Sequence, residues 1–218
     1  VTYDPNGDRL YVANFGAHRV TIYDVAGITN GEAAVDLLGQ YDGTSYTNPV
    51  PSYTRAAAND TPNRIGFNQP QGLVIDRANN RAFVADTTNN RVLVYNLDAN
   101  GEFLDRIPDR VLGQVNFIAN AAAITQAGLS GPSAMAFDPT KNLLYVLNVN
   151  RVTVYDVAAI SNGENAVFVL GQATFIANTA GNTQAGMNSP RGIALDVTGQ
   201  RLFVSQNGNN RVTAYDVS

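Results

Sequence analysis

The sequence predicts an all-β protein made of repeated four-stranded sheets, and three observations support this fold class. One stretch occurs four times in the 218-residue chain, at residues 4–23, 76–95, 138–155 and 196–215. Each copy contains short runs of branched and aromatic residues bounded by Asn, Asp, Gly or Pro, as is typical of strands. The apolar residues of these runs are contiguous, which indicates sheets covered on both faces. Antiparallel sheets that stack radially around an axis satisfy all three observations, so we predict a β-propeller.

The second repeat shows the expected strands of one blade. Its apolar runs are Leu73–Ile75, Ala82–Ala85, Val92–Tyr95 and Arg110–Gly113. Units of this kind occupy residues 1–40, 70–114, 132–172 and 190–218, and the last unit lacks the fourth run. We therefore expect a single propeller domain, or part of a larger propeller, that holds about four blades' worth of sheet and lacks the outer strand of its last blade.

Two short motifs recur at the outer part of each complete repeat. The fourth run ends in Leu-Gly-Gln, at residues 38–40, 112–114 and 170–172. An Asn-Gly-Glu turn precedes it, at residues 30–32, 100–102 and 162–164. Asn-Gly suits the positive φ angles of tight turns. The three glutamates of these turns are the only glutamates in the chain, so we interpret them as turn residues rather than general acids.

The first of the three connections between repeats is an insertion at residues 41–69. The other two connections are near copies of each other, and residues 56–59 and 119–127 are expected to form at most a short helical turn. The insertion contains three prolines and four residues that we predict to form a binding surface, Tyr41, Tyr46, Tyr53 and Arg55. Tyrosines offer apolar area with a polar tip, and a connection of this length without strand signals is functional or mobile. The alternative is a decoration that packs on the propeller.

The chain resembles NHL-repeat β-propeller sequences over all 218 residues. The resemblance rests on Pro190–Asp196 with Asn209–Val212, and on Pro70–Asp76 with Asn90–Val92. It implies NHL-type four-stranded blades. Families of this fold include extracellular and periplasmic binding modules, RNA-binding domains, and a few lyases and lactonases, so the fold alone does not choose a function.

Position within the repeat decides how the polar candidates are interpreted. His18, the only histidine, stands where the other copies carry Asn90, Asn150 and Asn210, so we interpret it as structural. The arginine that follows this position recurs as Arg19, Arg91, Arg151 and Arg211. We predict that these arginines are buried and hydrogen-bonded as part of the scaffold.

Asp86 is the one acid at its repeat position, where the other copies carry Asn14, Asn148 and Gln206. A group that departs from the repeat is a candidate for function, so we add Asp86 to the predicted binding residues. No residue is assigned a catalytic role. With one histidine and no cysteine, we expect neither a transition-metal site nor a cofactor.

Composition excludes several classes of partner. The net charge is −4 and the pI about 4.8, so no positive field attracts nucleic acid. The apolar runs are too short for a membrane helix, and we expect no membrane insertion.

We expect a non-enzymatic binding or structural module of a larger extracellular or cell-envelope protein. The alternative is a propeller lyase or lactonase whose site lies at the axial channel, with Asp86 among its polar groups.

The predicted functional surface is one face of the propeller. The turns between second and third strands, such as residues 15–18, 87–90 and 207–210, emerge there together with the three connections between repeats; we call it the loop face. We expect a protein partner, or another copy of this chain, to bind the loop face or the open edges of the blades. Four blades' worth of sheet must either close on themselves or be closed by further blades, because an open arc exposes apolar faces.

Overall fold

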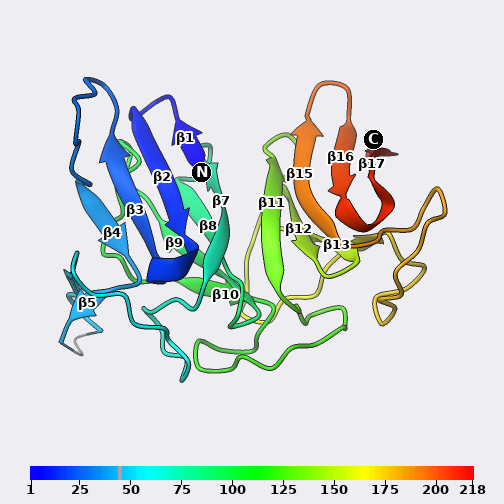
Figure 1. Ribbon diagram of the computed structural model, residues 1–218, viewed down its shortest axis with the longest axis horizontal. Helices are drawn as coiled ribbons and strands as arrows, with labels where there is room; N and C mark the ends of the chain where they lie inside the picture. The colour runs from blue at the N-terminus through cyan, green and yellow to red at the C-terminus, as the bar shows by residue number, and fades with distance from the viewer. Residues whose placement is uncertain (44–45) are drawn as a thin grey trace.

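The structure, a computed structural model, describes residues 1–43 and 46–218. Four of its antiparallel sheets, which we call the first to fourth blades, make up most of the molecule (Figure 1). The first blade contains β1 (Thr2–Asp4), β2 (Arg9–Asn14), β3 (Arg19–Asp24) and β4 (Asp36–Leu38). The second contains β7 (Pro70–Asp76), β8 (Arg81–Asp86), β9 (Arg91–Asn96) and β10 (Arg110–Leu112). The third contains β11 (Pro132–Asp138), β12 (Leu143–Asn148), β13 (Arg151–Asp156) and β14 (Phe168–Leu170). The fourth contains β15 (Pro190–Asp196), β16 (Arg201–Gln206) and β17 (Arg211–Asp216).

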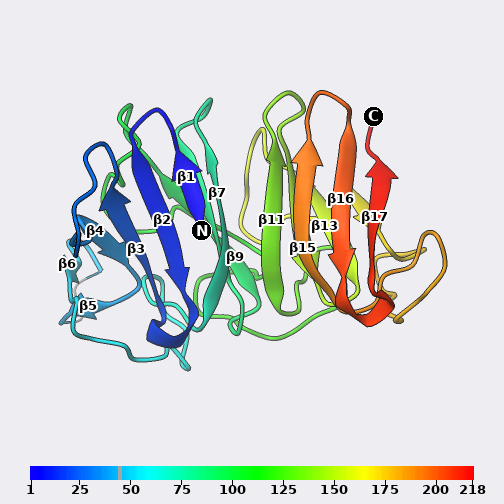
Figure 2. The ribbon, with the colours of Figure 1, turned by 45° about the horizontal axis from the view of Figure 1, so that its top comes forward.

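Neighbouring strands in each blade follow the order of the sequence. The innermost strands β1, β7, β11 and β15 succeed one another from left to right in Figures 1 and 2, and β11 contacts both β7 and β15. This arrangement confirms the predicted fold class, an all-β propeller assembly with four-stranded blades and a last blade of three strands.

Side chains from successive blades form the hydrophobic core. Tyr145 and Val154 of the third blade belong to the same buried cluster as Leu202 and Val204 of the fourth. Equivalent clusters join the first blade to the second and the second to the third. The first five residues of both β9 and β13 are buried because a blade covers each face of these sheets. This explains the contiguous apolar runs of the sequence.

The first and fourth blades each leave one face open. Along β17 half-buried residues alternate with exposed ones, and Val212 is 65% exposed, whereas its counterpart Val152 in the third blade is fully buried. In the first blade, Tyr3 is also exposed. Within the described residues the four blades therefore do not close into a ring. Of the two alternatives, closure by further blades stays a prediction.

The insertion and the short helices differ from the sequence-based expectations. A two-stranded ribbon of β5 (Tyr41–Asp42) and β6 (Val50–Pro51) lies within the insertion, too short to leave a strand pattern in the sequence. The windows 56–59 and 119–127 are not helical. The described helices are two 3₁₀ turns, η1 (Phe15–Ala17) and η2 (Asn207–Asn209). Neither has the length or the apolar character that crossing a bilayer requires.

Candidate functional site

Arg91 holds two connections of the loop face together beneath the surface. Its Nη2 donates to the carbonyl oxygen of Gly66, in the insertion, at 3.0 Å. Its Nη1 donates to the carbonyl oxygen of Phe117, in the next connection, at 2.5 Å. Its Nε lies 2.8 Å from Oδ2 of Asp86, and both side chains are fully buried. One guanidinium therefore fixes the connection that precedes its blade and the one that follows it.

The third blade repeats this arrangement with a neutral partner. Arg151 Nε donates to Oδ1 of Asn148 at 3.0 Å, and Nη2 donates to the Gly128 carbonyl at 3.1 Å. Nη1 donates to the carbonyl of Phe175, the counterpart of Phe117. The prediction of a buried, hydrogen-bonded scaffold arginine is confirmed for Arg91 and Arg151.

The fourth-blade arginine contacts only the preceding connection among the described residues. Arg211 Nη2 donates to the carbonyls of Thr183 at 2.6 Å and Gly186 at 3.0 Å, and Nη1 donates to Asn182 at 2.9 Å. The Arg211 side chain is half-buried rather than buried, because no following connection covers it in the described chain.

His18 occupies the position of an asparagine in the other blades and accepts the equivalent hydrogen bond. Its Nδ1 accepts a hydrogen bond from the amide of Gln69 at 3.1 Å, just before the first strand of the next blade. In the next two blades Asn90 Oδ1 accepts from Gly131 at 2.8 Å, and Asn150 Oδ1 accepts from Ser189 at 2.9 Å. His18 and Asn90 share a left-handed backbone, with φ of 51° and 53°. The structural interpretation of His18 is confirmed.

Asp86 lies under the loop face rather than on it. Oδ1 accepts from the amide of Asn68 at 2.6 Å, while Oδ2 accepts from Asn89 at 2.9 Å and from Arg91. Burial raises the pKa of Asp86, against the lowering effects of Arg91 and the hydrogen bonds. The carboxylate serves the scaffold in this structure, and its predicted role in binding remains a prediction.

Of the predicted tyrosines, Tyr41 is an anchor of the insertion. It is 5% exposed and clusters with Ile65 and Ile107. Its hydroxyl oxygen accepts from the Gly39 amide at 3.1 Å, and its hydroxyl donates to the Arg106 carbonyl at 3.3 Å. Burial raises the pKa of Tyr41, so the phenol stays neutral. Tyr41 therefore lies in the interior, and the expectation that it presents a surface for contact does not fit this position.

Tyr46 and Tyr53 do lie at the surface, 48% and 46% exposed. Arg19 Nη1 donates to the Tyr53 carbonyl at 2.5 Å, and Arg55 Nη1 donates to the Tyr41 carbonyl at 3.3 Å. The scaffold arginine of the first blade thus holds the backbone of the insertion while the ring of Tyr53 remains accessible. Where the backbone is held in this way, as at Tyr53, an accessible tyrosine loses less entropy on binding.

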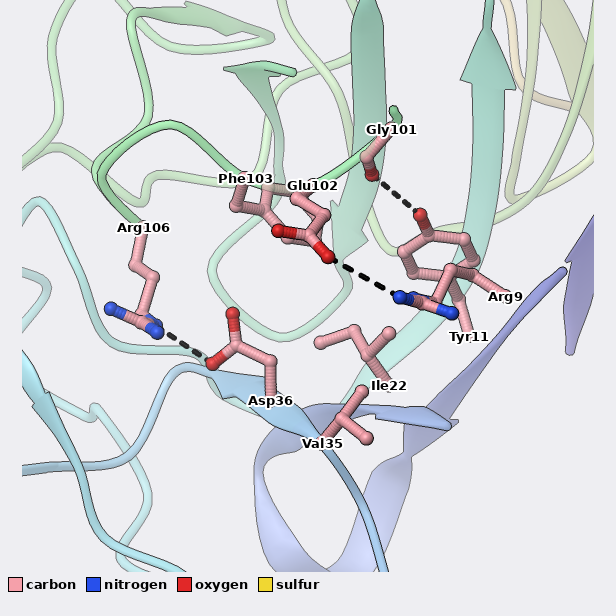
Figure 3. A pocket seen from close by; sticks show the side chains of 9 residues that line it. All are labelled: Arg9, Tyr11, Ile22, Val35, Asp36, Gly101, Glu102, Phe103 and Arg106. Atoms are coloured by element: carbon pink, nitrogen blue, oxygen red, sulfur yellow. Dashed lines mark hydrogen bonds and ion pairs between the residues drawn. The ribbon is translucent and has the colours of Figure 1, made fainter. Parts of the chain in front are cut away.

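The opposite face contains a cavity of about 190 Å³ between the first two blades (Figure 3). Tyr11, Ile22 and Phe103 form its apolar wall, and the rings of Tyr11 and Phe103 meet edge to face with centroids 6.0 Å apart. Two ion pairs border it: Arg106 Nε lies 2.7 Å from Asp36, and Arg9 Nη2 lies 3.3 Å from Glu102.

The charges of this cavity neutralise one another and join the blades. The Tyr11 hydroxyl donates to the Gly101 carbonyl at 2.9 Å, and burial raises the pKa of Tyr11 to about 12, so it remains a donor at neutral pH. Ligand pockets usually measure about 300 Å³ or more. We assign the cavity to contact between blades.

The Asn-Gly-Glu turns have a role that the sequence interpretation missed. Asn162 Oδ1 accepts from the Val111 amide at 3.0 Å, and the Gly163 amide donates to the Val111 carbonyl at 3.1 Å. The turn of the third blade therefore binds the outer strand of the second. Recurrence of the motif was the available signal, but recurrence alone does not distinguish a free turn from a contact between blades.

Among the described residues, no group of three or more His, Cys, Asp or Glu side chains is placed to hold a metal ion. A family model described as "Lactonase, 7-bladed beta-propeller" matches residues 1–218. The chain belongs to this family. No curated protein matches the sequence significantly. The membership agrees with the β-propeller prediction, whereas the finer NHL-repeat identity remains a prediction. The described residues provide four blades, and the family description counts seven.

Proposed function

We propose that this propeller is a binding module that recognises a protein partner through the insertion on its loop face. The observation that carries the proposal is the contrast at Tyr53 between a fixed backbone and an accessible ring, with the exposed ring of Tyr46 in the same insertion. Arg19 holds the Tyr53 carbonyl at 2.5 Å, yet the side chains of Tyr46 and Tyr53 remain nearly half exposed. Aromatic side chains on a rigid support are favoured as anchors of protein interfaces.

Three buried carboxylates are engaged in ion pairs, and this supports the same proposal. Asp86 pairs with Arg91, Asp76 pairs with Arg81 at 2.5 Å, and Asp4 pairs with Arg77 at 3.2 Å. Each of these carboxylates has almost no exposed surface. These groups stabilise the blades, which leaves recognition to other parts of the surface such as the variable connections of the loop face.

Site-specific photo-crosslinking tests the proposal. A photoreactive phenylalanine analogue placed at Tyr46 should form adducts with a protein of an extract from the source cells. The same analogue at Ile28, which is 72% exposed on the turns of the opposite face, is the matched control. Adducts from position 46 that a Tyr53→Ser change weakens are the expected result. Adducts of equal yield from position 28, or none from position 46, would contradict a partner at the insertion.

Lactone hydrolysis is the second candidate, favoured by membership of the lactonase family. Opening a lactone ring produces a carboxylic acid, which releases a proton at neutral pH, so the reaction can be followed as base consumption. Lactonase activity would appear as hydrolysis by the wild type that is faster than in buffer alone. If the double variant Tyr46→Ser/Tyr53→Ser then shows the same rate as the wild type, the activity lies away from the insertion. No rate with a range of five- and six-membered lactones would favour the binding module.

A further inference from the structure

Two adjacent amides attach the end of the insertion to the blades on either side of it. The Asn68 amide donates to Oδ1 of Asp86, in β8 of the second blade, at 2.6 Å. The Gln69 amide donates to Nδ1 of His18, in the turn between β2 and β3 of the first blade, at 3.1 Å. The bond to His18 therefore ties the first blade to the segment that leads into the second.

The junction of the third and fourth blades contains the same pair of hydrogen bonds, made there by carboxamides. The Asn188 amide donates to Oε1 of Gln206 at 3.2 Å, and the Ser189 amide donates to Oδ1 of Asn150 at 2.9 Å. These two side chains hold the repeat positions of the carboxylate and the imidazole of the first junction. A carboxamide carries no charge to lose or gain, so this second junction is a control without titratable acceptors.

The backbone of Gln69 needs support from its neighbours. Its φ is 56°, and that of its counterpart Ser189 is 47°. Residues with a side chain rarely adopt this left-handed conformation, which persists only where surrounding contacts hold it. The remaining counterpart is Gly131, for which a φ of 56° carries no such cost. Gln69 is therefore held in a conformation that it can leave when the bond to His18 is lost.

This bond requires the neutral form of the His18 ring. Nδ1 accepts from the Gln69 amide through its lone pair, so the ring hydrogen lies on Nε2. Protonation puts a hydrogen on Nδ1 as well, and two donors then face each other. Histidine is the side chain that ordinarily changes charge between about pH 5 and 8. Since the attached form binds fewer protons than the released form, the attachment weakens as the pH falls.

Four charged groups surround the attached segment. Asp86 pairs with Arg91 at 2.8 Å. Asp60, in the insertion, accepts a hydrogen bond from the side chain of the segment at 2.8 Å. Arg19 follows His18 in the chain, and its Nη1 donates to a carbonyl of the insertion at 2.5 Å. None of the four accepts the amide that His18 binds, so none of them replaces the imidazole when it is protonated.

The titration of Asp86 acts in the opposite direction. Burial raises the pKa of Asp86, against the lowering effect of Arg91. The raised pKa means that the fold gains from protonation of this carboxyl: the contribution is full below its ordinary pKa of about 4 and is lost as the pH rises through the folded-state pKa. Acid is therefore expected to release Gln69, while the adjacent Asn68 amide stays with Asp86.

We propose that the bond between His18 and Gln69 is a pH-sensitive switch between the first two blades. Near neutral pH the uncharged ring holds the end of the insertion against the first blade. In mild acid the protonated ring releases Gln69, which leaves its left-handed conformation and frees the end of the insertion on the loop face. The junction of the third and fourth blades stays attached throughout. The switch requires no partner at the insertion, so it stands or falls apart from the proposed function.

Amide hydrogen exchange of the full 218-residue chain, followed residue by residue, tests the proposal. Each rate is divided by the intrinsic rate at the same pH, because exchange itself depends on pH. Between about pH 7 and about pH 5 the Gln69 amide should lose about tenfold in protection, the change expected when a hydrogen bond of about 1.4 kcal/mol is lost. The Ser189 amide, as the internal control, should change by less than about twofold.

Two variants identify the group that titrates. His18→Asn should keep the Gln69 amide protected at both pH values, because asparagine accepts the equivalent bond in the other blades. Asn150→His places an imidazole at the junction of the third and fourth blades, and should make the Ser189 amide acid-sensitive. If Asn150→His fails to fold, the comparison of the wild type with His18→Asn still decides.

Three results would overturn the proposal. The first is equal protection of the Gln69 amide at both pH values in the wild type. The second is a loss in acid that persists in His18→Asn, which would assign it to Asp60 or Asp86. The third is an equal loss at Ser189, which would show that acid loosens all the blades alike.

Discussion

The Nε atom of Arg91 lies 2.8 Å from Oδ2 of Asp86, and neither side chain is exposed to solvent. In the third blade a neutral asparagine takes the place of this aspartate: Arg151 Nε lies 3.0 Å from Oδ1 of Asn148. The hydrogen-bond acceptor of the arginine Nε can therefore be a charged carboxylate or a neutral amide. The two blades provide a matched pair for measuring what the buried charge costs when its partner is removed.

We expect Arg151→Ala to lower the free energy of unfolding by about 2–4 kcal/mol, because it leaves several buried carbonyl acceptors and Asn148 without a donor. Arg91→Ala should cost more, about 3–5 kcal/mol, because it also leaves the buried carboxylate of Asp86 uncompensated. Chemical denaturation of both variants measures the difference. An unchanged midpoint for Arg151→Ala would show that these buried hydrogen bonds do not stabilise the fold and would reopen a binding role for the arginine.

The carboxylate of Asp138 gives the fold a pH dependence. Burial alone would raise the pKa of Asp138, but hydrogen bonds from Thr140 and Lys141 outweigh it, and the pKa is lowered. The hydroxyl of Thr140 donates at 2.6 Å and its amide at 2.8 Å. Because the folded-state pKa lies below the unfolded one, ionised Asp138 stabilises the fold above about pH 4, and this contribution is lost as the pH falls through the folded-state pKa.

We therefore expect Asp138→Asn to cost about 1 kcal/mol at pH 7 and progressively less as the pH falls below about 4. Urea titrations of the wild type and the variant across this range test the expectation. Asp196→Asn is the matched control, since Asp196 holds the same position in the fourth blade but is exposed and accepts one hydrogen bond, from Gly199. A cost for Asp138→Asn that grows toward low pH would contradict the assigned direction.

Substitution of His18 tests whether its role follows from its position in the repeat or from the chemistry of histidine. Asn90 and Asn150 accept the equivalent hydrogen bond through Oδ1, so His18→Asn should change the free energy of unfolding by less than about 0.5 kcal/mol. His18→Ala leaves the Gln69 amide without its acceptor and should cost about 1 kcal/mol. Thermal unfolding separates the two variants. Equal losses for both would mean that the imidazole does something that asparagine cannot.

Elemental analysis of the purified protein tests the expected absence of a transition-metal site. The chain has one histidine, already bonded through Nδ1 to the Gln69 amide, and no cysteine. We expect less than stoichiometric zinc, iron, copper or nickel after dialysis without chelator. Stoichiometric metal that His18→Asn removes would overturn both this expectation and the structural assignment of His18.

The repeat made most of the fold predictable. Strand residues such as Val92 and Val152 recur in the same sequence context, so their pairing follows once one blade is understood. The burial of the scaffold arginines followed from recurrence as well. Recurrence could not show which groups bind across blades. The contact of Asn162 with Val111 joins two blades, and that of Gln172 with Asn150 joins two segments of one blade. In both contacts the partner is a backbone atom, which carries no sequence signal.

The sequence predicts which segment forms the candidate surface, but not which of its side chains are exposed. The insertion stands out because it breaks the repeat, but the sequence does not distinguish Tyr41 from Tyr53. Tyr41 lies in the two-residue strand β5 beside Gln40, where its ring turns toward Ile65 and Ile107. That orientation depends on the pairing of Tyr41 with Pro51, a contact that only the folded chain defines.

This difference between the tyrosines leads to a prediction that separates packing from recognition. Tyr41→Ser removes a buried ring and its two hydrogen bonds, and should cost about 3 kcal/mol or more. The double variant Tyr46→Ser/Tyr53→Ser removes largely exposed rings, and should change stability by less than about 1 kcal/mol while weakening partner binding. Thermal melts and the photo-crosslinking yield, measured from a probe at Arg55, give both quantities for each variant. A large loss of stability in the double variant with the crosslinking yield preserved would mean that the exposed tyrosines only pack the insertion against the first blade.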